Sequence, residues 1–139
     1  IKETGLYTIN HVHPDFIERA HYTSAKFSPE VSEFDICNLT EQYIDPYKVP
    51  FVKESNFKMA LELQDTIEIA LNKTILVIGE IIYLEVPDEA FVNDDINLEA
   101  SKTVGISGLN SYYEIKFLNS FPYPRVDEVP NIKRWRKRI

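Results

Sequence analysis

The chain has 139 residues, of which 44% are hydrophobic and 12% aromatic. This length and composition fit one folded domain with a core of its own and exclude a disordered chain. The longest apolar stretch, residues 74–84, is interrupted by Gly79 and Glu80. No run therefore reaches the ~18–20 residues that a membrane-spanning helix needs, and the first residues carry no secretory signal pattern.

The net charge of −7 conceals an uneven distribution. Residues 131–139 hold five bases and no acid, which leaves 10 bases against 22 acids, a net charge of −12, in residues 1–130. Such an acidic body argues against a nucleic-acid-binding surface, which needs a basic face. We expect the basic tail to pair with the acidic body or with a neighbouring subunit; a hook for an anionic surface is the alternative.

Cys37 is the single cysteine, so the chain has no internal disulfide and no cysteine-based metal site. This usage fits a reducing compartment, and we expect a cytoplasmic protein. We interpret Cys37 as a small buried or half-buried side chain.

Taken in chain order, alternating apolar and polar residues predict a strand over residues 6–12. Pro14 is suited to the first turn of a helix, which we expect to run to about Thr23. A short helix follows over residues 31–37. Residues 38–45 are interpreted as another short helical piece with Thr40 as its N-cap. Residues 49–53 are expected to be extended.

The strongest strand pattern covers residues 57–64, where Lys58 falls on the polar side of the alternation. The pattern continues with a bend through residues 65–71. A tight connection at residues 72–73 leads into a long β-branched strand over residues 74–86, in which Gly79 indicates a bulge or barrel bend. Residues 87–95 form an acidic linker with a possible helical turn at residues 88–92. A last strand region covers residues 104–106 and 112–117, around Ser107 and Gly108, and the prolines beyond Ser120 disfavour further helices or strands.

Few motifs of known chemistry are present. His11 and His13 share one side of a predicted strand, but no acidic or cysteine partner lies at a metal-binding spacing, so we expect ordinary surface or strand-end histidines and no metal site. The chain has no glycine-rich phosphate loop and no nucleophile elbow, and its four glycines exclude a dinucleotide fingerprint. The spacing of its carboxylates suggests no acid–base pair, and we assign no catalytic residue.

The segment AHYTSAKFSPEVSEFD, residues 20–35, is more distinctive. Small and hydroxyl-bearing residues, Thr23, Ser24 and Ala25, follow a helical stretch and precede the amine of Lys26 and the ring of Phe27. Small residues let a backbone approach a flat ligand, and their polar groups can bind carbonyl or phosphate oxygens. From the residues alone, an ordinary loop with helix-capping groups remains the simpler alternative.

Four ordered pieces resemble the flavin-reductase-like domain of the FMN-binding split barrel. These are the segment above, then NLTEQYIDPYKVPFVKES, LNKTILVIGEIIYLEVPD and VGISGLNSYYEIKFLNSFPYPR. The resemblance implies a mainly β fold, a Greek-key-like split β-barrel with short helices. It also implies a homodimer that binds FMN at the dimer interface and accepts hydride from NADH or NADPH for a monooxygenase or another electron acceptor.

The resemblance also implies particular flavin contacts. In YTINHV, Asn10 matches a position near the flavin, and residues 23–27 match the loop that lines the isoalloxazine ring: Thr23, Ser24, Ala25, Lys26 and Phe27. Tyr112, Tyr113 and Arg125 match the segment at the mouth of the site. The sequence departs from the family at Pro124, where an alanine is usual, and has no proline directly after Arg125.

We expect residues 1–130 to form the split-barrel domain and residues 131–139 a basic tail. Because Ile1 stands in place of an initiator methionine and the family's phosphate-binding segments precede this region, we expect the chain to be a fragment. The expected function is an FMN-dependent NAD(P)H oxidoreductase. The alternatives are a flavin-binding electron-transfer module without NAD(P)H activity of its own, and a scaffold domain that binds no flavin.

Overall fold

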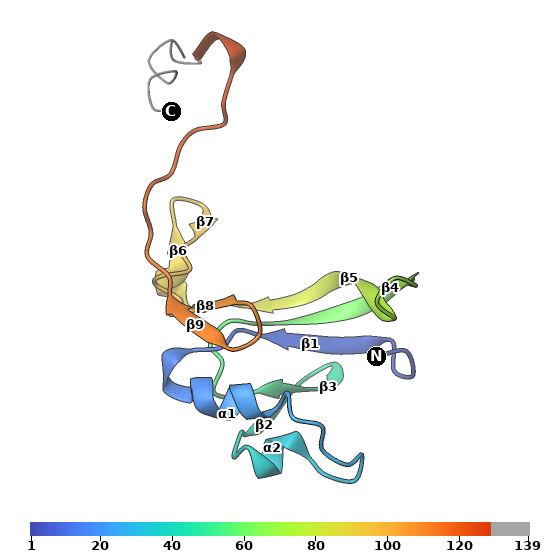
Figure 1. Cartoon of the computed structure of the whole chain (residues 1–139). Helices are drawn as coiled ribbons and strands as arrows, with labels where there is room; N and C mark the ends of the chain where they lie inside the picture. The colour runs from blue at the N-terminus through green and yellow to red at the C-terminus, as the bar shows by residue number, and fades with distance from the viewer. Residues whose placement is uncertain (129–139) are drawn as a thin grey trace.

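A three-stranded antiparallel sheet in the order β1-β4-β5 is the centre of the fold (Figure 1). The computed structural model describes residues 1–128, so the predicted tail and the domain boundary at residue 130 lie outside the described residues. Strand β1 (Leu6–Asn10) pairs with β4 (Lys58–Ile69), which pairs with β5 (Thr74–Glu85). The three strands predicted from alternation are thus confirmed, and the fold is mainly β as predicted.

The β4–β5 turn closes without the usual glycine. Lys73 adopts a left-handed conformation (φ +59°), and its N–H donates to the carbonyl of Ile69 at 3.0 Å. The side-chain oxygen of Asn72 accepts from the N–H and hydroxyl of Thr74, at 3.2 and 2.7 Å. Side-chain acceptors of this kind replace backbone turn bonds, which explains why Asn72 and Lys73 suffice here.

Two register shifts bend the β4–β5 ribbon, one between Leu63 and Asp65 and one between Ala60 and Leu61. The predicted bend at Gly79 adjoins the first, because Gly79 is paired with Leu63. A Cβ atom at Gly79 would lie 2.9 Å from Cζ of Tyr7. The ring of Tyr7 therefore occupies the space of a side chain, which is why glycine is needed at this position.

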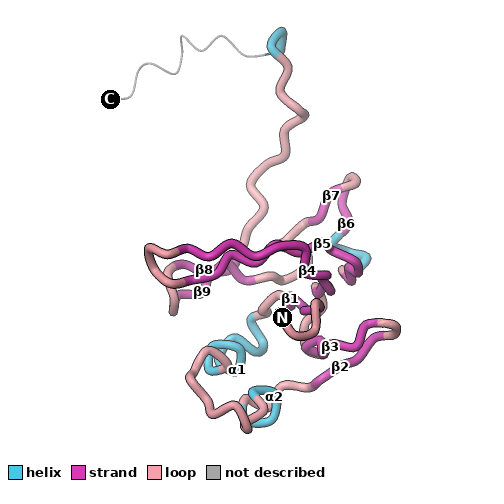
Figure 2. Tube along the Cα trace, turned by 90° about the vertical axis from the view of Figure 1, so that its right-hand side faces the viewer, coloured by secondary structure: helices cyan, strands magenta, loops and turns pink. Residues whose placement is uncertain are grey.

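A second hairpin, β2 (Glu41–Ile44) with β3 (Tyr47–Val52), replaces the short helix predicted for residues 38–45. That prediction was wrong. The N–H and hydroxyl of Thr40 each donate at 3.1 Å to the Glu54 carboxylate instead of capping a helix. In both views β1 lies between β4 and β3, so the hairpin continues the curvature of the sheet (Figures 1 and 2).

The predicted helices are short. A 3-10 turn, η1 (Pro14–Phe16), leads into α1 (Ile17–Tyr22), and α2 (Glu33–Ile36) follows with the Ser32 hydroxyl accepting from the N–H of Asp35 at 3.4 Å. Both helices were predicted and both lie near the β2–β3 hairpin (Figure 1). None of the helices within residues 1–128 has the length and apolar character required to cross a membrane.

The C-terminal part is a series of small elements. The predicted acidic linker contains η2 (Asp88–Ala90) and leads into a hairpin of β6 (Phe91–Val92) and β7 (Asp95–Ile96). The predicted last strands are β8 (Val104–Ser107) and β9 (Ser111–Glu114), joined by a turn in which Gly108 has φ +61°. Strand β9 ends three residues earlier than predicted. Residues 115–125 then form an extended arm, ending at η3 (Val126–Glu128), that leads away from the sheets (Figure 1).

The core lies between β3 and one face of the sheet. Strand pairing places Thr8, Ala60 and Tyr83 side by side on that face. Phe51 of β3 packs against it, with its ring centroid 5.7 Å from that of Tyr83 in an edge-to-face arrangement. Phe51 and Ala60 are both fully buried.

Lys58 also belongs to this core and is only 2% exposed, which contradicts the prediction that it lies on a solvated face. The ammonium group donates to Oε1 of Gln42 at 2.7 Å and lies 3.5 Å from Oε1 of Glu85. The hydroxyl of Tyr83 donates to Glu85 at 2.8 Å, and burial together with this carboxylate raises the pKa of Tyr83 to about 12. The β2–β3 hairpin covers this face at the start of β4, so Lys58 and Ala60 are interior, whereas Glu62 and Gln64 further along the strand are exposed.

We expect Lys58→Ala to lower the free energy of unfolding by about 2 kcal/mol, because it leaves Gln42 without its partner and opens a cavity. Lys58→Met keeps the aliphatic stem, removes the desolvation cost of the ammonium and should change stability by less than about 1 kcal/mol. Urea unfolding of the two variants measures the difference. Equal losses in both would mean that the charge, and not the packing, stabilises this core.

Candidate functional site

The side chain of Asn10 joins β1 to β3. Its oxygen accepts from the N–H of Val52 at 3.0 Å, and its nitrogen donates to the hydroxyl of Thr8 at 3.0 Å. That hydroxyl donates in turn to the carbonyl of Pro50 at 2.8 Å. Asn10 and Thr8 thus supply hydrogen bonds that a regular strand pair would make through its backbone. The contact of Asn10 with flavin stays a prediction.

The predicted flavin loop, residues 23–27, begins where α1 ends. The hydroxyl of Thr23 donates to the carbonyl of Ala20 at 2.8 Å, and that of Ser24 donates to the carbonyl of His21 at 2.7 Å. Both hydroxyl hydrogens are therefore engaged by carbonyls of the last helical turn. Their oxygens can still accept a hydrogen bond, but neither residue is a free donor for a ligand in this structure.

The rest of this loop presents different groups. Ala25 and Lys26 are exposed and Phe27 is half-buried. Within residues 1–128, no carboxylate lies within ion-pair distance of the Lys26 ammonium group. Lys26 is thus the residue of this loop with a side-chain donor to offer an electron-rich ligand.

His21 connects this loop to β9. Its Nδ1 lies 3.1 Å from the hydroxyl of Tyr112, and the two rings meet edge to face with their centroids 5.9 Å apart. The structure therefore brings Tyr112, a predicted site residue, to the end of α1, the helix that precedes the predicted loop, across a sequence separation of 91 residues. Tyr113 points to the opposite side of the strand and is 57% exposed.

Arg125 does not join this group. It is exposed and lies on the extended arm, which leads away from α1 and β9 (Figure 1). Among the predicted contacts, the structure thus groups the loop with Tyr112, leaves Asn10 at the β1–β3 junction and places Arg125 apart.

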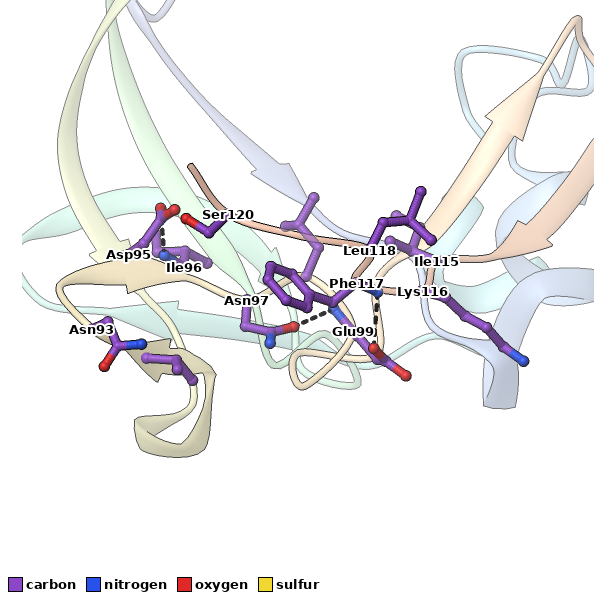
Figure 3. A pocket seen from close by; sticks show the side chains of 12 residues that line it. Asn93, Asp95, Ile96, Asn97, Glu99, Ile115, Lys116, Phe117, Leu118 and Ser120 are labelled. Carbon is purple, nitrogen blue, oxygen red and sulfur yellow. Dashed lines mark hydrogen bonds between the residues drawn. The ribbon is translucent and has the colours of Figure 1, made fainter. Parts of the chain in front are cut away.

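A separate cavity of about 510 Å³ lies between the β6–β7 hairpin and the arm (Figure 3). The carboxylate of Glu99 accepts from the N–H of Phe117 at 2.9 Å and holds the arm against it. None of the predicted flavin contacts lines this cavity. Its wall is mainly apolar, formed by Val92, Ile96, Leu98, Ile115, Phe117 and Leu118.

His11 takes part in a directed chain of hydrogen bonds. The hydroxyl of Ser101, which is fully buried, donates to the carbonyl of Leu98 at 3.0 Å. It must then accept from the Thr103 hydroxyl, 2.9 Å away, which in turn must accept from Nδ1 of His11 at 2.9 Å. This order assigns the proton of neutral His11 to Nδ1.

His13 is buried, with 5% of its surface exposed. Of the two positions expected for it, at the surface or at the end of a strand, the surface position was wrong. Its ring stacks on Phe16 with centroids 5.6 Å apart. Burial lowers the pKa of both His11 and His13. Within residues 1–128, no three His, Cys, Asp or Glu side chains gather in a way that could hold a metal ion.

His21 is the residue of this site that sequence reasoning did not identify. It lies eight residues after His13 and no motif surrounds it. Its partner, Tyr112, comes from β9, and only the fold brings the two together. No signal in a single sequence indicates such a pair.

The comparisons with known proteins agree with this architecture. The family model "Flavin reductase like domain" matches residues 1–104. A split-barrel protein from Shewanella frigidimarina, assigned by name to the flavin reductases, is 45% identical to this chain. Its structure matches with a TM-score of 0.83, and the match covers 87% of this chain and 62% of that protein. The flavoredoxin of Desulfovibrio vulgaris shares the fold at 22% identity, with a TM-score of 0.73 over 88% of this chain and 66% of its own.

A curated relative, an uncharacterized protein of Halalkalibacterium halodurans, is 26% identical over 115 residues, which are 80% of this chain and 55% of that protein. The chain therefore spans little more than half the length of this relative. The fold is that of a split-barrel flavoprotein, as predicted. The chain belongs to the flavin reductase-like domain family, a family of flavin-binding oxidoreductases.

The residues present fit a flavin in part. Lys26 offers a donor, Ala25 leaves room for a flat ring, and Tyr112 contributes an aromatic side chain beside the loop. When bound, a flavin supplies the redox chemistry itself, and the protein orients it and tunes its charge. These residues would then hold one edge of the ring system.

The role of Asn10 in the fold can be tested without any ligand. Asn10→Ala leaves the N–H of half-buried Val52 without its acceptor and should lower the free energy of unfolding by about 1 kcal/mol. Asn10→Asp keeps an acceptor for Val52 and should cost less. Chemical unfolding of both variants measures this, and an alanine variant as stable as the unmodified protein would contradict the structural role.

The histidines predict an acid-sensitive fold. Because the pKa of His11 and His13 is lowered on folding from 6.5, the unfolded chain binds protons first, and stability should fall as pH decreases below about 6.5. His13→Phe keeps the stack on Phe16 and removes one titrating group. Thermal unfolding between about pH 7 and pH 5 should show a smaller loss in this variant. An identical loss would show that His13 does not contribute.

Proposed function

We propose that this chain is the FMN-binding part of an NAD(P)H-dependent flavin or acceptor oxidoreductase, in which hydride passes from the nicotinamide to the flavin. The observation that supports this most is the joining of the loop at residues 23–27 to β9 through His21 and Tyr112. It gathers residues expected to contact one flat ligand from two distant parts of the chain. Family membership provides the chemical class.

The proposed roles follow from the groups that each residue has available. Lys26 binds an electron-rich edge of the ring and stabilises negative charge there. Thr23 and Ser24 keep the loop in place because their hydroxyls are bound to helix carbonyls. Tyr112 forms a wall beside the loop. Hydride transfer needs an open slot for the nicotinamide and correct orientation more than a protein acid or base.

We further propose that the chain acts as a homodimer in the cytoplasm. Support comes from exposed apolar side chains on one face of the β4–β5 ribbon, where Ile67 lies directly opposite Leu76. With Ile69 and Ile78 they form a patch whose members are 40–49% exposed. Apolar patches of this kind mark interaction surfaces. The electron acceptor is a monooxygenase component or another protein or small-molecule acceptor.

Flavin titration tests the proposal. We expect FMN to bind with quenching of its fluorescence, and Lys26→Met to weaken the affinity about tenfold, the equivalent of one charge-assisted hydrogen bond of roughly 1.4 kcal/mol. Lys53→Met is the matched control, since it removes a lysine outside the loop. Equal FMN affinity in the Lys26 variant and the unmodified protein would remove the assigned role of Lys26.

Anaerobic addition of NADH or NADPH separates the proposed function from its main alternative. Bleaching of the flavin absorbance is the expected result. Binding without bleaching would identify a flavin-binding electron-transfer module, a candidate that the fold shared with a flavoredoxin favours. A chain that binds no FMN would be a scaffold domain.

A further inference from the structure

We propose that His21 is a positioning residue for the flavin site, and that its contact with Tyr112 fixes the loop at residues 23–27 relative to β9. This inference rests on the proposed function, because it concerns how the two halves of the proposed site are kept together. His21 is not among the expected flavin contacts. It acts through its neighbours and not by touching the ligand.

His21 contacts both halves of the proposed site at once. Its backbone carbonyl accepts from the N–H of Ser24 at 3.2 Å and from the Ser24 hydroxyl at 2.7 Å. Its ring nitrogen Nδ1 lies 3.1 Å from the hydroxyl of Tyr112. One residue therefore holds the start of the loop through its backbone and the strand through its side chain.

Helix α1 has few other contacts that fix its position on the domain. The helix has six residues and none of them is buried. On its other side, Arg19 donates to the carbonyl of Asn38 at 2.7 Å and lies 3.4 Å from Glu54. A helix this short is not stable by itself, so its position depends on such side-chain anchors. Among residues 1–128, His21 provides the hydrogen-bonded anchor toward β9.

The rings of His21 and Tyr112 also meet in a defined orientation. The planes of His21 and Tyr112 make an angle of 83°, an edge-to-face contact that adds to the hydrogen bond. Two interactions with different directional preferences restrict the orientation of Tyr112 more than either does alone. Tyr112 is thereby held beside the loop, whereas Tyr113 faces away.

The experiment measures FMN affinity in His21→Ala, Tyr112→Phe and the double variant, using quenching of flavin fluorescence in the full chain. We expect each single change to weaken FMN binding about five- to tenfold, the range of one lost hydrogen bond, and the double variant to be no weaker than the weaker single one. His21→Asn keeps a side-chain hydrogen-bonding group and should recover at least part of the affinity. Tyr43→Phe, which changes an exposed tyrosine of β2 outside the proposed site, is the control and should leave the affinity unchanged.

A readout on the contact itself accompanies the titrations. The ring-nitrogen NMR shifts of His21 should change in Tyr112→Phe and stay constant in Tyr43→Phe. Circular dichroism and urea unfolding identify variants that are less folded, and the affinity is compared at equal folded fraction. A purely structural role would lower stability without changing FMN affinity per folded molecule.

The outcomes are distinct. FMN binding that is unaffected in His21→Ala and Tyr112→Phe, or losses that add in the double variant, would overturn the positioning role and leave the proposed function standing. Unchanged His21 shifts in Tyr112→Phe would overturn the contact. If the unmodified chain binds no FMN, the proposed function fails and this inference fails with it.

Discussion

A polar row formed by half-buried Asn10, buried Lys58 and Glu85, whose side chain is 40% exposed, holds the two β-layers of this domain together. Strand pairing places these three residues side by side across β1, β4 and β5. Asn10 reaches β3 through the N–H of Val52, and Lys58 reaches β2 through Gln42. Polar groups buried in this way are unfavourable unless each has a partner. The partners all come from the β2–β3 hairpin and the sheet, so the row specifies how one docks on the other.

The position of the candidate site follows from that docking. Glu54, directly after β3, receives hydrogen bonds from Thr40 and lies 3.4 Å from Arg19 of α1. These bonds lower the pKa of Glu54 in spite of its partial burial, so the carboxylate stays charged in the folded protein. The hairpin thus anchors one side of α1, and β9 anchors the other through His21. The loop at residues 23–27 lies at the end of a helix with two attachments.

Secondary-structure elements that depend on neighbouring residues could be predicted from the sequence. The alternation in β4, the β-branched run of β5 and the proline at the start of η1 all led to correct predictions of secondary structure. Where the prediction failed, distant parts of the chain decided the outcome. Thr40 resembles a helix cap, yet its groups bind Glu54, fourteen residues later. Lys58 has the sequence character of a surface residue, and only the hairpin that covers it makes it interior.

The candidate site also contains some residues that the sequence identified and others that only the fold brings together. Residues 23–27 and Tyr112 were identified through resemblance, since no spacing rule relates them. The structure links Tyr112 to His21, in the helix that precedes the loop, and the flavin contacts stay predictions. The donor function expected of Thr23 and Ser24 could not be judged from sequence, because it depends on which carbonyls the end of α1 leaves unpaired. His21 was missed for a related reason. Its partner lies in a strand whose position is set by the whole fold.

The far half of the β4–β5 ribbon presents apolar side chains to water. Beyond the β2–β3 hairpin, two paired strands carry Ile67, Ile69, Leu76 and Ile78 on one face, where residues 1–128 leave these side chains 40–49% exposed. An isolated two-stranded ribbon is marginally stable in water and needs a third layer against its apolar face. The charged Lys58 is enclosed while these isoleucines are open, the reverse of what a self-sufficient monomer requires. The proposed homodimer resolves this contradiction, because a second subunit against the ribbon would remove its apolar face from water.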